Sequence, residues 1–375
     1  MTPRYFPSVS YILVIVVLFI TACQGQKREQ SAAKPSALTK KVVSLPTPGT
    51  PPPPQVNPLN DPSLVSQYIR TIFQDSRGTY WFGPAGRSVA SYDGDTLMYY
   101  SMEAFFAGND LLDRETGNSV HSTAEDAAGN VWFGTHIGLI KYDGKTFKNY
   151  TSNSGLTETN ISRNSMLLDQ SGQFWVGTQG GLFLYDPEAD RKGEPCFSLF
   201  GKLPPITVKD IHQDRIGNIW IASGERGVFR YDGSSVQNFT EKDGLSDNYA
   251  GGIAEDSKGN IWFTIEAGIC RYDGTSFTEF KSEIGIPKYD VWGILIERGT
   301  DIVWITARGR TIRFDPSVPL TNPDAYKIFK PEDGLNCCVQ SMYQDQEGNV
   351  WWGAGEGLFR FDGENFYKVK RDGPW

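Results

Sequence analysis

Asp126-Ala-Ala-Gly-Asn-Val-Trp-Phe-Gly-Thr135, followed by Tyr142-Asp-Gly144, is one copy of a pattern that recurs along the chain. Another copy reads Asp256-Ser-Lys-Gly-Asn-Ile-Trp-Phe263 and continues to Tyr272-Asp-Gly274. The tryptophans of the copies, spaced by 42 to 51 residues, are Trp81, Trp132, Trp175, Trp220, Trp262, Trp304 and Trp351. A period of about 40–50 residues, with room for four short strands, predicts a β-propeller.

The seven copies predict an all-β, seven-bladed β-propeller with four antiparallel strands per blade, running from about residue 62 to the last residue. In the first copy we expect strands at Ile69–Gln74, Thr79–Gly83, Ser88–Tyr92 and Leu97–Tyr100. Because every copy supplies its own inner and outer strand, the first and last blades need not exchange a strand.

The repeated aspartate and tryptophan are interpreted as structural. Asp at the start of a tight turn accepts backbone N–H bonds, and Gly three residues later takes the unusual φ. The alternative, a calcium loop, requires several carboxylates at alternate positions, whereas each turn has one reliably placed Asp. Since a tryptophan occurs in every copy, we expect it to pack between neighbouring blades.

The first 58 residues are expected to lie outside the propeller. Residues 1–22 resemble a signal peptide, with Arg4 followed by an apolar run too short to span a membrane permanently. The ending Ile20-Thr-Ala-Cys23 resembles a bacterial lipobox, which implies cleavage before Cys23, lipidation of its thiol and anchoring to a membrane. Residues 23–58 hold many prolines and predict an extended tether, so the globular domain is expected at 59–375.

The net charge of the propeller segment limits the kinds of partner that it can bind. The chain has 36 Lys/Arg and 44 Asp/Glu; the signal segment holds one Arg, and the tether holds five Lys/Arg and one Glu, which leaves −13 on the propeller. Such an acidic body argues against nucleic acid as a ligand. Apart from Cys23, the cysteines are Cys196, Cys270, Cys337 and Cys338, without metal-ligand spacing. A disulfide between the adjacent pair remains open.

The repeat resembles the two-component regulator propeller family. The features that carry the resemblance are Asp-x-x-Gly-Asn-x-Trp-Phe-Gly-Thr, the later Tyr-Asp-Gly, and Gly155-Leu-Thr, Gly244-Leu-Ser and Gly334-Leu-Asn before the next inner strand. In that family the propeller is the extracytoplasmic sensor part of receptors with kinase output. No membrane helix or kinase follows the last copy in this sequence, so we expect a ligand-binding or protein-binding propeller without kinase output. A location in the cell envelope follows, with the outer membrane favoured by resemblance, because Gln24 follows Cys23.

A candidate binding site is expected where the copies diverge. Five residues before each turn Asp, near the start of the inner strand, the side chain varies, whereas the next residue stays small or compact. The varying residues are Arg70, His121, Asn164, Lys209, Gly251 and Gln340, with Trp292 as the counterpart in the sixth copy. The loops between second and third strands add Arg87, His136, Gln179, Arg226, Glu266, Arg308 and Glu356, and Tyr249 and Tyr289 add aromatic faces. These residues predict a site for a glycan, peptide or protein at the channel mouth.

Three alternatives remain open at this stage. The polar ring could simply fill a wet channel. The repeats also resemble, more weakly, the propeller of streptogramin lyases, as at Trp262-Phe-Thr-Ile-Glu266, which would imply a metal and a general base. The third alternative is a structural module of an envelope complex. We expect no cofactor and no resident metal.

Overall fold

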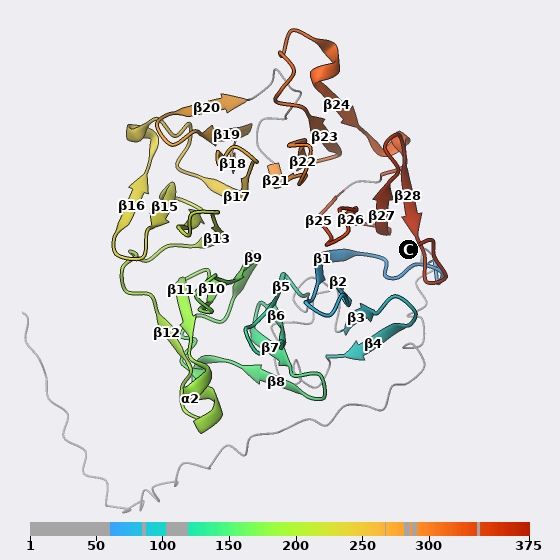
Figure 1. The fold of residues 1–375 in the computed structure, drawn as a ribbon. Coiled ribbons are helices and arrows are strands. Elements are labelled where there is room, and N and C mark those ends of the chain that lie inside the picture. Colours follow the sequence, from blue (N-terminus) through green and yellow to red (C-terminus); the bar gives the residue numbers. More distant parts are fainter. Residues whose placement is uncertain are drawn as a thin grey trace, which may run out of the picture. The chain divides into compact units, whose positions relative to one another are not determined.

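The computed structural model describes residues 61–84, 88–102, 119–266, 268–280, 286, 291–335 and 338–375. Seven four-stranded antiparallel sheets form a ring, each made of four strands consecutive in the chain (Figure 1). The predicted seven-bladed β-propeller is therefore confirmed, and in the described part of the chain each blade is built from its own four consecutive strands. The predicted signal peptide, lipidated Cys23 and tether lie outside the described residues.

We number the blades along the chain. Blade one holds β1 (Ile69–Gln74), β2 (Tyr80–Pro84), β3 (Ser88–Tyr92) and β4 (Leu97–Ser101). Blade two holds β5 (Ser122–Glu125), β6 (Val131–Thr135), β7 (Gly138–Tyr142) and β8 (Phe147–Tyr150), and blade three β9 (Ile161–Leu168), β10 (Phe174–Thr178), β11 (Gly181–Tyr185) and β12 (Phe197–Leu199). Blade four holds β13 (Val208–Gln213), β14 (Ile219–Ser223), β15 (Val228–Tyr231) and β16 (Val236–Phe239).

The remaining blades follow the same order. Blade five holds β17 (Ala250–Glu255), β18 (Ile261–Ile265), β19 (Gly268–Tyr272) and β20 (Phe277–Phe280), blade six β21 (Val291–Ile296), β22 (Val303–Ala307), β23 (Arg310–Phe314) and β24 (Tyr326–Phe329), and blade seven β25 (Ser341–Gln344), β26 (Val350–Ala354), β27 (Gly357–Phe361) and β28 (Phe366–Val369). Among the residues that the structure describes, the connections contain the short helix α2 (Pro187–Lys192) and the 3₁₀ turns η2 (Ser152–Ser154), η3 (Glu241–Asp243), η5 (Pro323–Ala325) and η6 (Pro331–Asp333).

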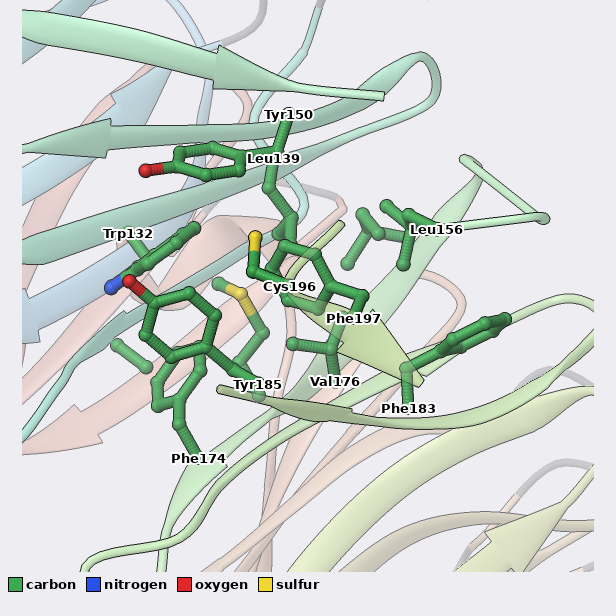
Figure 2. Close-up of a cluster of buried hydrophobic side chains, with 13 residues drawn as sticks. Trp132, Leu139, Tyr150, Leu156, Phe174, Val176, Phe183, Tyr185, Cys196 and Phe197 are labelled. Atoms are coloured by element: carbon green, nitrogen blue, oxygen red, sulfur yellow. The ribbon is translucent and has the colours of Figure 1, made fainter. Parts of the chain in front are cut away.

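The hydrophobic core lies between the blades. Trp132 of blade two, fully buried, has its ring centroid 5.4 Å from that of Phe174 and 4.9 Å from that of Tyr185, both in blade three (Figure 2). Each of the other repeat tryptophans contacts an aromatic ring of the next blade in the same way, and Trp351 closes the ring by packing 5.2 Å from Tyr80. The predicted position of the tryptophans between blades is therefore confirmed.

Each turn aspartate anchors the tryptophan six residues later. In blade four, one oxygen of Asp214 accepts the backbone N–H groups of Ile216 and Asn218, and the other accepts the Nε1–H of Trp220 at 2.8 Å. Blades one, two, three, five and seven repeat the Asp–Trp bond. These donors engage both carboxylate oxygens, which supports the structural interpretation of the turn over a calcium loop.

Blade six reaches the same geometry with a different residue. Its turn is one residue longer, and Glu297, seven residues before Trp304, accepts the Nε1–H of that tryptophan. The extra methylene of glutamate compensates for the additional turn residue.

Hydrogen bonds also join blade to blade near these turns. At six of the seven interfaces, the residue after the turn Asp or Glu donates to a side chain of the next blade. The pairs are Ser76 with Glu125, Gln170 with Gln213, Arg215 with Glu255, Ser257 with Asp301, Arg298 with Gln344, and Gln346 with Gln74. Between blades two and three, Leu168 stands where most of the other acceptors have Glu or Gln, and no such bond forms among the described residues.

A different contact joins blades two and three. Asp190 of α2 accepts hydrogen bonds from Lys141 and Lys148 and, at 2.7 Å each, from the hydroxyls of Tyr150 and Tyr185. The Asp190 carboxylate is only 6% exposed. The insertion in blade three therefore supplies an ionic contact at the one interface that lacks the repeated bond.

The ring closes through the segment before β1. Leu64 forms a backbone bridge with Lys370, and the Nε–H of Arg371 donates to the Leu64 carbonyl at 2.8 Å. Among the cysteines, Cys196 and Cys270 are buried free thiols, and Cys338 is disulfide-bonded. Cys337 lies outside the described residues.

Candidate functional site

The varying position of the repeat coincides with a β-bulge. The pairing register of the innermost strand shifts between Ile69 and Thr71, between Val208 and Asp210, and between Val291 and Gly293. The extra residues at these shifts are Arg70, Lys209 and Trp292. Because a bulge residue leaves the strict in-and-out alternation of a strand, its side chain can be re-aimed, here toward the channel.

In four blades, a Thr or Ser pairs with a glycine at the position that follows the varying residue. In blades one, two and seven, the inner strand has Thr71, Ser122 or Ser341 opposite a glycine of the second strand; in blade six the order is reversed, with Gly293 opposite Thr306. A Cβ placed on Gly83 would come within 2.5 Å of the Thr71 hydroxyl oxygen. The small residues after the bulge therefore serve the packing of the channel wall.

The bulges surround a cavity at the channel mouth with a volume of about 390 Å³. Six of the seven blades contribute to its lining. Of the predicted site residues, those that line the cavity are Arg70, His121, His136, Asn164, Gln179, Lys209, Tyr249 and Trp292. The size lies within the range of small-molecule pockets.

Two histidines of blade two meet in this cavity. The ring centroids of His121 and His136 are 4.0 Å apart, and Nδ1 of His136 lies 2.8 Å from Oδ1 of Asn160. Burial, and after it the positive charges of His136, Arg70 and Arg163, lower the pKa of His121 to about 3. His121 is therefore neutral at neutral pH, and its Nε2 is buried without a hydrogen-bond partner.

Three permanent cations share the cavity. Arg70, Arg163 and Lys209 all line it, and among the described residues none of them forms an ion pair. The Arg70 guanidinium lies 5.2 Å from the ring centroid of Tyr68, and the Lys209 ammonium lies 5.9 Å from that of Tyr249. Burial, and then the nearby Arg70, lowers the pKa of Arg163.

One carboxyl group, that of Asp210, lies among the described lining residues. Its oxygens accept the backbone N–H of Ile211 at 2.7 Å and of Ile253 at 3.0 Å, so it links blade four to blade five. Burial raises the pKa of Asp210 well above its usual value, although these N–H bonds oppose the shift. The carboxyl group thus serves the wall of the channel and does not neutralise the three cations.

The remaining predicted site residues lie elsewhere. Gln340, Arg226, Glu266, Arg308 and Glu356 do not line the cavity; the last four are exposed, and Glu356 pairs with Lys368 at 3.1 Å. Blade seven contributes no lining residue among those described. Arg87 and Tyr289 lie outside the described residues.

The sequence reasoning missed Arg163, together with Asn160, Ser162 and Asp210. In β9 the register shifts between the partners of Val176 and Thr178, so that residues 162–165 bulge, and Asn164 takes a φ of 50°. An alignment that assigns one divergent residue to each blade finds Asn164 and overlooks the neighbouring arginine. The unusual length of the polar Ser-Arg-Asn-Ser run was the available signal.

Two kinds of feature are absent from the described part of the chain. No group of three or more His, Cys, Asp or Glu residues there is placed to hold a metal ion. No helix there has the length and apolar character needed to cross a membrane.

The comparisons with known proteins agree with this architecture. Residues 63–86, 115–136 and 244–266 match the two component regulator propeller family. The resemblance inferred from the repeat is thus confirmed in these three segments of a seven-bladed propeller. No curated protein matches the chain significantly by sequence.

Three solved structures illustrate the fold. The extracellular domain of BT3049 from B. thetaiotaomicron, assigned to a hybrid two component system, is similar over 80% of this chain and 51% of that one, at 19% identity and a TM-score of 0.54. Virginiamycin B lyase from Staphylococcus aureus is similar over 80% of this chain and 96% of that one, at 15% identity and a TM-score of 0.59. PorZ of Porphyromonas gingivalis, a component of the type-IX secretion system, is similar over 79% and 46%, at 16% identity and a TM-score of 0.55.

These likenesses establish the fold alone, because each identity is below 20%. The chain spans about half the length of the BT3049 domain. Glu266, which the sequence offered as a lyase-like residue, is exposed and does not line the cavity.

Proposed function

We propose that this protein is a sensor-type propeller that binds a small ligand at the mouth of its central channel. The observation that carries the proposal is the cavity lined by Arg70, Lys209 and Trp292, the bulge residues of three different blades. A repeat that varies at one position, and places that position of six blades around one cavity, is suited to recognition.

The proposed location is extracytoplasmic, with lipid at Cys23 as the anchor. The apolar run of residues 11–20, the lipobox-like ending and the proline-rich stretch support export and tethering. The solved BT3049 domain, which has the same fold, is extracellular. In this proposal the tether holds a binding domain near a membrane surface.

A binding screen tests the proposal. The full chain, purified in detergent, would be screened against glycans and peptides, and each hit measured by isothermal titration calorimetry. We expect Trp292→Ala to weaken binding of a true hit about tenfold or more, since truncating a central aromatic contact commonly costs above 1 kcal/mol.

Gln340→Ala is the matched control. Gln340 occupies the same repeat position in blade seven but does not line the cavity. We expect it to bind as the wild type does. Hits that bind Trp292→Ala and the wild type equally would place recognition elsewhere on the propeller.

A further inference from the structure

We propose that the ligand carries an anionic group, a carboxylate, sulfate or phosphate, that is bound by Arg70, Arg163 and Lys209. This inference rests on the proposed function, because it names the chemical class of ligand for the same cavity. It starts from cations that line a concave site and have no ion-pair partner among the described residues.

Unpaired cations in such a position are unusual. Arg70, Arg163 and Lys209 are each partly buried, and a charge that is withdrawn from water is normally paired, because its desolvation is otherwise costly. The Nε atom of Arg70 is buried without a hydrogen-bond partner. A guanidinium offers a planar fork of donors that matches a carboxylate or phosphate.

The local charge opposes that of the whole domain. The propeller segment carries a net charge of −13, as derived from the sequence, yet the described cavity lining holds three permanent cations and one carboxyl group. Even with Asp210 ionised, two positive charges remain in excess. An acidic protein that concentrates cations in one concave site creates a local field for anions.

Other lining groups indicate that the anion belongs to an organic molecule. Tyr249 and Trp292 present aromatic rings to the same cavity, and Asn160 and Gln179 add amide groups. The neutral imidazole of His121 leaves one more buried nitrogen without a partner. Apolar faces beside a few polar groups are typical of small-molecule sites.

The test uses defined anions on the full chain in detergent at pH 7.5. Inorganic phosphate, inorganic sulfate and D-glucuronate would be titrated, each against KCl at matched ionic strength, with D-glucose as the neutral counterpart of glucuronate. We expect a rise in Tm of about 2–4 °C for at least one anion near tenfold its Kd, and none for D-glucose. Comparing the titration with glucuronate with those with phosphate and sulfate shows which kind of anion the cavity prefers.

Variants separate specific binding from salt effects, since sulfate and phosphate stabilise many proteins by exclusion. We expect the double variant Arg70→Gln, Lys209→Gln to bind the anion at least about tenfold more weakly, as measured by calorimetry. Arg226→Gln, an exposed arginine outside the cavity, should retain wild-type affinity.

Two results would overturn the inference. One is an anion response that is absent in the wild type or unchanged in the double variant. The other is a screen whose hits are neutral and depend on Trp292 but not on the cations. That second result would leave the proposed binding function intact, whereas hits indifferent both to Trp292 and to the cations would place recognition outside this cavity and reject the proposed function.

Discussion

At the residue scale, each repeat tryptophan has two roles. Its ring packs against aromatic residues of the next blade, and its indole N–H is bound by the turn carboxylate of its own blade. Trp220, only 2% exposed, lies 5.7 Å from the ring centroid of Phe263 and 2.8 Å from Oδ2 of Asp214. The same side chain therefore fixes the turn and the blade interface.

These two roles can be separated by substitution. Trp220→Ala should lower the free energy of unfolding by about 3–5 kcal/mol, because it removes a large buried ring. Trp220→Phe should destabilise less, because an aromatic ring remains. It still loses the hydrogen bond to Asp214, which should cost about 1–3 kcal/mol. Chemical denaturation measures both. An unchanged midpoint in Trp220→Ala would show that this ring is not part of the interblade core.

The residue scale also shows the limit of sequence reasoning. Arg70 and Lys209 could be identified as divergent positions because they stand five residues before a recognisable Asp, and Trp292 stands at the same distance before Glu297. Arg163 could not, because the long bulge in β9 breaks the one-residue-per-blade alignment. Asp210 was grouped with small residues, since its bonds to the backbone of blade five depend on tertiary structure.

At the element scale, strand positions were predictable because turn chemistry brackets them. In blade one, the strands Ile69–Gln74 and Ser88–Tyr92 have the expected bounds, the second strand is shifted by one residue, and the fourth is one residue longer. Blade three has an insertion, which contains α2, between its third and fourth strands. Its role was not predictable, because the partners of Asp190 in blade two lie at least 40 residues away in sequence.

The helix α2 gives a prediction on stability and pH. Burial alone would raise the pKa of Asp190, but bonds from Lys141, Lys148, Tyr150 and Tyr185 lower it below its usual value. Asp190→Asn should destabilise the propeller by about 3–5 kcal/mol at pH 7, because two cations lose their buried partner.

The sign of the pH effect follows from the lowered pKa. The contribution of Asp190 is present above the unfolded-state pKa of about 4 and declines as pH falls through the lower folded value. The difference in Tm between wild type and Asp190→Asn should therefore be constant from pH 7 to 5 and shrink below about pH 4. Asn149→Asp, at an exposed position of β8, is a control for a change of one charge. A pH-independent difference would contradict the ionic role of Asp190.

At the scale of the whole molecule, the two ends of the channel differ. The turns that join neighbouring blades are built from one repeated Asp and its bonds, whereas the bulges at the cavity are each different in side chain. Stability thus depends on the turn bonds that the blades share. Recognition is proposed to depend on the bulge side chains, which differ between blades. The side chains that line the cavity can therefore change while the closed ring of blades is kept.

The proposed anchor places this domain at a membrane and gives the last prediction. If Cys23 carries lipid, Cys23→Ala should move the protein from the membrane fraction to the soluble fraction, because a hydrocarbon chain supplies about 0.8 kcal/mol per buried CH₂ group. Cys196→Ala, a change at a buried thiol of the propeller, should leave the protein in membranes and serves as the control. Fractionation with carbonate extraction measures both. Retention of Cys23→Ala after carbonate would show that another segment anchors the chain, while the channel-mouth proposal would stand.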